Sequence, residues 1–189
     1  GSTGPVTGPV MRLAIHAEDS DTPLPSGEVG RVCFRGPSVM KCYFNRDEDT
    51  AKAVSPGGWF DSGDLGYLDE DGYLFLVDRA KDIIVRGGEN ISCLEVEACL
   101  HGHPEVRDVT VFGLPDERLG EIVGAMIFLR PEGQGASAEA LTAYAAQSLA
   151  KYKIPAEFMF TDEPLPRGPT EKIDKKTVRA AVLTERGLT

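Results

Sequence analysis

The chain has 189 residues, of which 41% are hydrophobic and 26% are charged, a composition typical of a soluble globular protein with a core of its own. Its 30 acidic residues exceed its 20 basic ones, which gives a net charge of −10 and a pI of about 4.8. This charge disfavours nucleic acids and anionic membranes as partners, and no hydrophobic run reaches the ~18 residues that a membrane span needs.

The first half of the chain is predicted to form strands and turns. Residues 1–10 are expected to form a plain loop, because they lack the lysine and the following helix of a phosphate-binding loop. Residues 10–16 and 27–36 predict strands, and residues 66–78 predict a hairpin. The acidic turn of that hairpin, Asp69–Gly72, has too few oxygen ligands for a calcium loop and is interpreted as a turn.

Residues 55–64, with the sequence SPGGWFDSGD, are expected to form a loop between two strands. This segment carries two carboxylates, Asp61 and Asp64. Loops of this kind more often carry function than the core does, so these carboxylates are candidate binding groups.

The second half predicts a compact two-layer α+β domain. Its predicted elements, in chain order, are a Gly-Gly hairpin at 82–92, a helix capped by Ser92, strands at 106–116 and 121–131, an amphipathic helix at 137–152, a strand at 156–162 and a last helix capped by Asp174. The pattern changes at VDRAKD, residues 77–82, with Lys81 at the join. We therefore expect a β-rich domain at 1–80 and the α+β domain at 81–189.

The four cysteines show neither the density nor the CxxC spacing of a disulfide or redox protein, and no signal peptide is recognisable, so the cytoplasm is the expected compartment. Cys99, His101 and His103 have a spacing that metal ligands can adopt. No second pair of ligands accompanies them, and imidazoles also suit the last carbonyls of a helix. No metal site is predicted.

Lys172 lies in a segment broken by Pro and Gly, LPRGPTEKIDKK at 165–176, just before the last predicted helix. A solvated lysine without a specific role would explain it. The alternative is a lysine that reaches a nucleotide, provided that other parts of the protein supply a nucleotide site. Lys and Arg outnumber Asp and Glu from Arg167 onward, which is a suitable charge for a polyphosphate.

Three stretches, in order, carry a family resemblance: GEVGRVCFRGPSVMKCYFN at 27–45, GWFDSGDLGYLDEDGYLFLVDRAKDIIVRGGENIS at 58–92, and LPRGPTEKIDKKTVR at 165–179. In these stretches the chain resembles the C-terminal part of the adenylate-forming enzymes, which include acyl- and aryl-CoA ligases, luciferases and peptide-synthetase adenylation domains. The resemblance implies that the first domain is the β-rich end of a large N-terminal domain, and that the second is a mobile C-terminal α+β domain.

The resemblance also implies roles for residues around the domain boundary. Asp64 takes the place of the family's aspartate that accepts hydrogen bonds from the ribose hydroxyls of ATP, as a carboxylate can do for two vicinal hydroxyls. Arg79 takes the place of the arginine that also reaches the ribose. Lys81 takes the place of the hinge about which the small domain rotates between an adenylating and a thioester-forming pose.

Further roles follow in the second domain. Gly87, Gly88 and Glu89 take the place of the residues that line the pantetheine tunnel, where missing side chains let a thin ligand pass. Lys172 takes the place of the lysine that bridges the carboxylate substrate and the α-phosphate. The family usually has Gly just before this lysine, and here the residue is Glu171, whose charge is unfavourable near a triphosphate unless it points away.

The resemblance implies an AMP-forming acyl-CoA synthetase that acts in fatty acid metabolism on a carboxylic acid, ATP and CoA with Mg²⁺. The phosphate loop, the Mg²⁺ ligands and the acyl pocket are not in this sequence and are expected upstream, in a missing N-terminal portion, so the isolated chain is expected to be inactive. The segment RGGENIS at 86–92 is closer to CoA ligases than to peptide-synthetase domains. Two alternatives stay open: an adenylation domain that loads a carrier protein, and a non-catalytic binding module.

Overall fold

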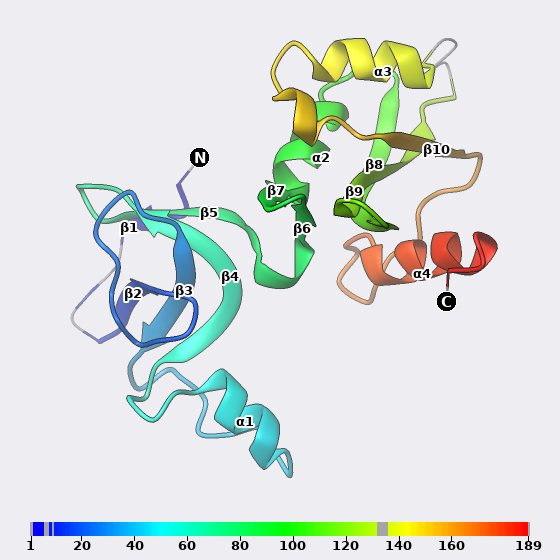
Figure 1. Cartoon of the computed structure of the whole chain (residues 1–189). Coiled ribbons are helices and arrows are strands. Elements are labelled where there is room, and N and C mark those ends of the chain that lie inside the picture. Colours follow the sequence, from blue (N-terminus) through cyan, green and yellow to red (C-terminus); the bar gives the residue numbers. More distant parts are fainter. Residues whose placement is uncertain (1, 6–7, 9, 132–135, 189) are drawn as a thin grey trace. The chain divides into compact units, whose positions relative to one another are not determined.

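The computed structural model describes residues 2–5, 8, 10–131 and 136–188 and divides the chain into two compact units, Gly1–Lys81 and Asp82–Thr189 (Figure 1). The division follows Lys81 directly. Residues 1, 6, 7 and 9 of the expected N-terminal loop lie outside the described residues.

The first unit is built on a five-stranded antiparallel sheet with the strand order β1-β5-β4-β3-β2. Its elements are β1 Gly4–Pro5, β2 Arg12–His16, β3 Gly30–Arg35, α1 Asp47–Ala53, β4 Phe60–Leu68, β5 Tyr73–Arg79 and the 3-10 helix η1 Ala80–Asp82. The predicted strands and the hairpin are confirmed. In the hairpin turn, Asp69 Oδ1 accepts the backbone N–H groups of Asp71 at 3.1 Å and of Tyr73 at 2.8 Å, which explains the acidic residue without a metal.

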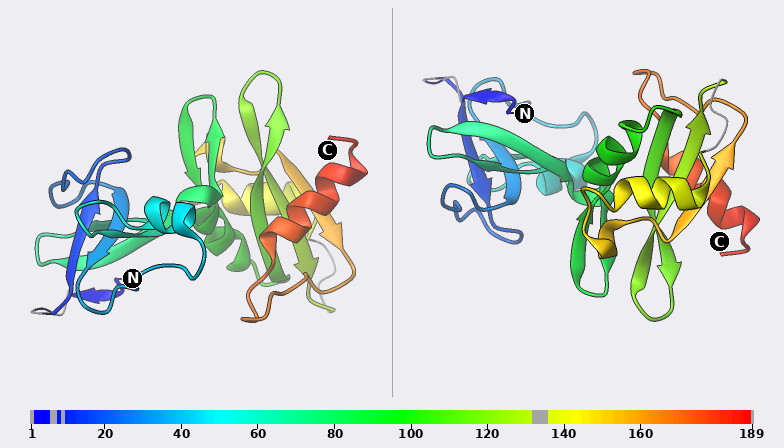
Figure 2. Two further views of the ribbon diagram at one scale, coloured as in Figure 1. Left: turned by 90° about the horizontal axis from the view of Figure 1, so that it is seen from below. Right: turned by 90° about the horizontal axis from the view of Figure 1, so that it is seen from above.

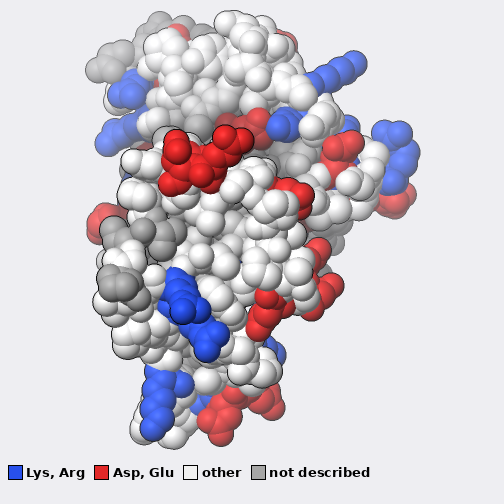
Figure 3. Space-filling model, turned by 90° about the vertical axis from the view of Figure 1, so that its left-hand side faces the viewer, with Lys and Arg blue, Asp and Glu red and all other residues white. Residues whose placement is uncertain are grey.

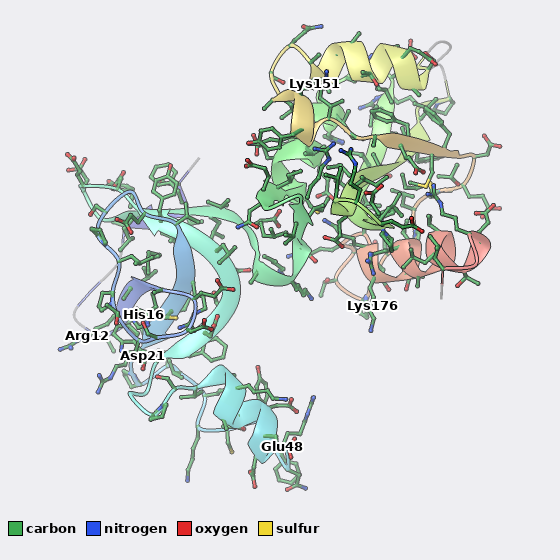
Figure 4. The ribbon with its side chains drawn as sticks, viewed as in Figure 1. Arg12, His16, Asp21, Glu48, Lys151 and Lys176 are labelled. Carbon is green, nitrogen blue, oxygen red and sulfur yellow. The ribbon has the colours of Figure 1, made fainter. Side chains whose placement is uncertain are left out.

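The core of the first unit is small and contains one buried polar ring. Ile15, Val32 and Leu74 form its centre. His16, at the end of β2, is fully buried beside them and lies near Asp21 (Figure 4), with 3.7 Å between His16 Nδ1 and Asp21 Oδ1. Its ring packs edge-on against Trp59.

Three expectations for the first unit are wrong. Gly4 and Pro5, in the expected N-terminal loop, form the short strand β1, which pairs with β5. Residues 47–53 form a helix, α1, whose first turn carries Asp47, Glu48 and Asp49, a charge that suits a helix N-terminus. Strand β4 begins at Phe60, inside the segment expected to be a loop, because pairing with β3 (Phe34 with Phe60) outweighs the turn preference of Ser-Gly-Asp.

The second unit combines one sheet with helices, as the sequence predicts, but the helix expected at 137–152 ends at Ala145 and is followed by a separate 3-10 helix. Its elements are β6 Ile83–Arg86, β7 Glu89–Ser92, α2 Cys93–His101, β8 Val106–Asp116, β9 Gly120–Leu129, α3 Ala138–Ala145, the 3-10 helix η2 Lys151–Lys153, β10 Glu157–Thr161 and α4 Lys175–Glu185. The strand order is β10-β9-β6-β7, with β8 also paired to β9; β10 runs parallel to β9 and the other pairs are antiparallel.

Helices cover both faces of this sheet, with α3 and α4 on opposite sides (Figure 2). On one face, Val109 and Val111 of β8 pack with residues of α2 and α3. On the other face, Phe112 and Leu114 of β8 pack against α4. The α+β class is confirmed, and α4 adds a third layer to the two that the sequence predicts.

The predicted caps of α2 and α4 are present. Ser92 Oγ accepts the Glu95 N–H at 3.1 Å, and Asp174 Oδ1 accepts the Thr177 N–H at 3.1 Å. Within the described residues, the helices are too short and too polar to span a bilayer.

Candidate functional site

The first unit places Asp64 beside Arg79. The two residues are register partners on β4 and β5, with Asp64 Oδ1 3.5 Å from Arg79 Nε. Their side chains are 30% and 54% exposed, so both remain accessible to a ligand. The two predicted ribose-binding groups therefore lie side by side.

The backbone before Asp64 is fixed by the side chains of its neighbours. Asp61 Oδ1 accepts the Gly63 N–H at 2.8 Å, and Gly63 has a φ of 75°. Ser62 Oγ accepts the Asp64 N–H at 3.1 Å and donates to Val32 O at 2.8 Å. Asp64 thus extends from a segment that is tied to β3.

Asp61, the other candidate carboxylate, has a structural role. Its Oδ2 accepts a hydrogen bond from Arg31 Nη1 at 2.7 Å, and Arg31 also donates to the carbonyls of Ala17 and Ser20. Burial and the nearby Asp61 charge raise the pKa of Cys33 to about 11, so this thiol is not a nucleophile at neutral pH. Of the two carboxylates, Asp64 is the one available to bind.

An open, mainly apolar hollow of about 450 Å³ lies next to Asp64. Its walls come from the N-terminal segment and from β2 to β5, at Thr3, Gly4, Pro5, Met11, Leu13, Val32, Phe34, Asp64, Leu74 and Leu76. The first unit therefore presents an uncovered apolar surface at the carboxylate predicted to bind a nucleotide.

Lys81 lies in η1 and is exposed, as the last residue of the first unit. No ion pair or hydrogen bond of its side chain occurs among the described residues. The chain changes from one unit to the other directly after it.

In the second unit, the residues predicted for the tunnel form the tip of the β6–β7 hairpin. Gly87 and Gly88 both adopt left-handed backbone angles, with φ of 59° and 90°. A Cβ on Gly88 would meet no heavy atom within 4 Å, whereas a Cβ on Gly87 would lie 3.1 Å from Leu119 Cδ2. Glu89 opens β7 and is exposed. These three residues lie together, with open space at Gly88.

Lys172 lies elsewhere in the second unit, in a tight turn between β10 and α4. Arg167 and Ile173 form an isolated bridge that closes the turn. Inside it, the Gly168 N–H donates to Lys172 O at 2.8 Å and the Glu171 N–H donates to Gly168 O at 3.0 Å. The Lys172 side chain is exposed, and within the described part of the chain its ammonium has no carboxylate or carbonyl partner.

Glu171 has a left-handed backbone with a φ of 61°. Glycine adopts this conformation without cost, whereas other residues do so with strain. The geometry gives a physical reason for the glycine that the family resemblance predicts at this position. The sequence indicates that Glu171 replaces the expected glycine, but it does not indicate the left-handed backbone at this position.

Sequence reasoning missed a residue that acts on this turn. Arg167 Nη2 donates to Asp108 Oδ1 at 2.8 Å, and Arg167 Nη1 donates to Glu171 O at 2.7 Å. Asp108 lies 59 positions earlier, on β8. The only local signal is an arginine at the start of the turn, and it does not indicate this partner.

Two of the three candidate metal ligands, His103 and Cys99, have other partners. His103 packs edge-on against Tyr144 and its Nδ1 accepts the Glu105 N–H at 3.3 Å, while Cys99 Sγ contacts Ser148 Oγ at 3.2 Å. Among the residues with described positions, no group of three His, Cys, Asp or Glu side chains suits a metal ion. On the face drawn in Figure 3, Lys and Arg form small separate groups between acidic side chains.

Comparison with known proteins bears on the family resemblance. Residues 95–172 match the family described as AMP-binding enzyme C-terminal domain, and the resemblance to the C-terminal portion of the adenylate-forming enzymes is thereby confirmed.

One curated CoA ligase and two proteins of known structure are similar over most of the chain. The crotonobetaine/carnitine–CoA ligase of Salmonella heidelberg (strain SL476) is 41% identical over 165 residues, which are 86% of this chain and 32% of that protein. ATP-bound MatB from Rhodopseudomonas palustris has a TM-score of 0.87 at 30% identity, over 96% of this chain and 35% of that chain. The o-succinylbenzoate CoA synthetase MenE from Bacillus subtilis, in complex with ATP and magnesium ion, has a TM-score of 0.84 at 38% identity, over 95% of this chain and 36% of that one. The chain spans about a third of the length of the curated relatives it matches.

Proposed function

We propose that the chain is the C-terminal third of an AMP-forming acyl-CoA synthetase, in which Lys172 serves the adenylation step. The observation that carries this proposal is the turn at 167–173. It holds an exposed lysine without a protein partner among the described residues, in a chain similar to CoA ligases.

In the first step, a carboxylate oxygen of the substrate attacks the α-phosphorus of ATP, and pyrophosphate leaves. Negative charge builds up on the α-phosphate oxygens, and the Lys172 ammonium stabilises it. Asp64 accepts hydrogen bonds from the ribose hydroxyls, and Arg79 donates to the same ribose. Their adjacent positions on β4 and β5 support this pairing.

In the second step, the thiol of CoA attacks the acyl carbonyl of the adenylate, and AMP leaves. Gly87, Gly88 and Glu89 line the passage for the pantetheine arm, and the open space at Gly88 supports this role. Between the two steps, rotation about Lys81 moves Lys172 out of the active site and brings this hairpin into it. The exposed position of Lys81 at the end of the first unit supports the hinge.

The remaining groups of the enzyme come from an N-terminal portion of the same protein. The apolar hollow beside Asp64 supports this, because a covering domain would bury it. The described residues do not suit Mg²⁺, so its ligands also belong to that portion. All four cysteines are thiols, which supports a cytoplasmic enzyme, and we assign it to the metabolism of fatty or related carboxylic acids.

The test is ATP–pyrophosphate exchange by the longer protein that carries this chain, over a panel of fatty and aromatic acids. We expect exchange with at least one acid, followed by acyl transfer to CoA. The 189-residue chain alone is expected to be inactive in the same assay, since its sequence has no phosphate loop. Acyl transfer to a carrier protein but not to CoA would contradict the proposed acceptor, and absence of exchange with every acid would contradict the adenylation itself.

A further inference from the structure

Arg167 joins the Lys172 turn to the sheet of the second unit through both arms of its guanidinium. One arm donates to Asp108 Oδ1 at 2.8 Å, and the other donates to Glu171 O at 2.7 Å. Asp108 lies on β8, where it pairs with Phe128 of β9, and its side chain is only 18% exposed. The acceptor on the sheet is therefore firmly placed.

The second acceptor is the peptide group that leads directly into Lys172. Glu171 O belongs to the peptide bond between Glu171 and Lys172, and Glu171 has the left-handed φ of 61°. A residue with a Cβ tends to leave this region unless surrounding contacts hold it there. Within the turn itself, those contacts are the Gly168–Lys172 and Glu171–Gly168 backbone hydrogen bonds. Arg167 adds a charge-assisted hydrogen bond to Glu171 O, from a side chain outside the strained peptide.

We infer that Arg167 is a positioning residue for Lys172. Arg167 holds the strained Glu171–Lys172 peptide against β8. The inference rests on the proposed function only in the role that it gives to Lys172. The planar guanidinium can reach two acceptors at fixed geometry, whereas a lysine ammonium acts as a single point charge. Arg167→Lys should therefore keep the charge and lose most of the positioning.

The first experiment needs no activity and uses the 189-residue chain. Amide hydrogen exchange is measured by NMR at the Gly168 N–H, which bonds to Lys172 O. Arg167→Ala and Asp108→Asn are each expected to raise the exchange rate of this amide about tenfold, as lost charge-assisted hydrogen bonds should. Arg167→Lys should raise it by a similar factor. Glu171→Gly combined with Arg167→Ala should restore part of the protection, because glycine removes the strain.

The matched control is Arg186→Ala, which removes another arginine–carboxylate pair, between Arg186 of the α4 C-cap and Glu157 of β10. It should leave the Gly168 amide unchanged. The exchange rates of amides in β8 and β9 report whether each variant stays folded. If Arg167→Ala changes these rates, the inference is tested with Arg167→Lys and Asp108→Asn instead. A Gly168 exchange rate within a factor of about two of the parent in the folded variants would overturn the inference.

The second experiment uses the longer enzyme. Arg167→Ala should lower the kcat of adenylation about tenfold, less than loss of Lys172 itself, and leave KM for ATP and the thioester step nearly unchanged. A purely structural role would lower both steps alike. If Lys172→Ala leaves adenylation intact while Gly168 exchange still responds to Arg167→Ala, the proposed function fails and the positioning of the turn stands.

Discussion

Among the described residues, two that are not glycine have a positive φ, Asn45 and Glu171, and asparagine tolerates this region better than glutamate does. The φ of 61° at Glu171 costs about 1–2 kcal/mol for a residue with a Cβ. Glycine relieves that cost but adds about 0.4–1 kcal/mol of unfolded-state entropy. We therefore expect Glu171→Gly to raise the free energy of unfolding of the chain by about 0.5–1 kcal/mol, measured by urea denaturation.

Glu163→Gly is the matched control, because Glu163 is also exposed and does not have a positive φ. It should be neutral or destabilising. Equal effects of the two glycine substitutions would show that the turn stores no backbone strain.

The two carboxylates of β4 are expected to differ when each is changed to the amide. Asp64→Asn should raise KM for ATP in the longer enzyme about tenfold, since the amide is a poorer acceptor for ribose hydroxyls. It should hardly change stability, because the Asp64–Arg79 pair is long and exposed. Asp61→Asn should lower stability and hardly change KM for ATP, since Asp61 anchors Arg31 at 2.7 Å. Pyrophosphate-exchange kinetics and thermal unfolding measure the two effects, and a loss of ATP affinity confined to Asp61→Asn would refute the assignment.

At the scale of elements, Glu97 connects α2, β8 and α4. Its Oε1 accepts hydrogen bonds from Val111 N at 2.7 Å and Thr110 Oγ1 at 3.3 Å, and it lies 2.9 Å from Lys175 Nζ. The ion pair is about one-fifth exposed. This contact fixes the start of α4, just after the Lys172 turn.

Removal of Glu97 should therefore destabilise the second unit strongly. Glu97→Ala leaves a mostly buried ammonium and an edge-strand N–H without partners, and we expect a loss of about 2–3 kcal/mol in the free energy of unfolding. Glu95→Ala, on the same helix, breaks the more exposed pair with Lys153 and should cost at most about 1 kcal/mol. Chemical denaturation compares the two variants, and similar losses would contradict the bracing role of Glu97.

The elements that the sequence predicts well are those whose signals are local. Ser92 and Asp174 cap their helices as expected, and Gly87 and Gly88 form the hairpin turn. The start of β4 depends instead on pairing with β3, which the local Ser-Gly-Asp sequence does not indicate. The contact of Arg167 with Asp108 joins residues 59 positions apart, and only the folded sheet brings them together.

At the scale of the whole molecule, the second unit is proposed to rotate about Lys81 between the two steps of the reaction. Lys81→Pro fixes φ near −65° at a residue that has to change its backbone conformation. In the longer enzyme, we expect this substitution to favour one pose and to slow one half-reaction far more than the other. Single-turnover assays of adenylation and of thioester formation measure the two rates. If both fall by the same factor, the hinge lies at another residue.

The most direct test of the whole account compares the two half-reactions after removal of one ammonium group. In the longer enzyme, Lys172→Ala should slow adenylation by about 10²-fold or more, as loss of a preorganised charge does in other active sites. Thioester formation from supplied acyl adenylate should barely change, because the proposed rotation at Lys81 carries the Lys172 turn away before that step. Lys176→Ala serves as the matched control, since this lysine extends from α4 into solvent four residues later (Figure 4). An equal fall of both steps in Lys172→Ala, or no fall in either, would contradict the account.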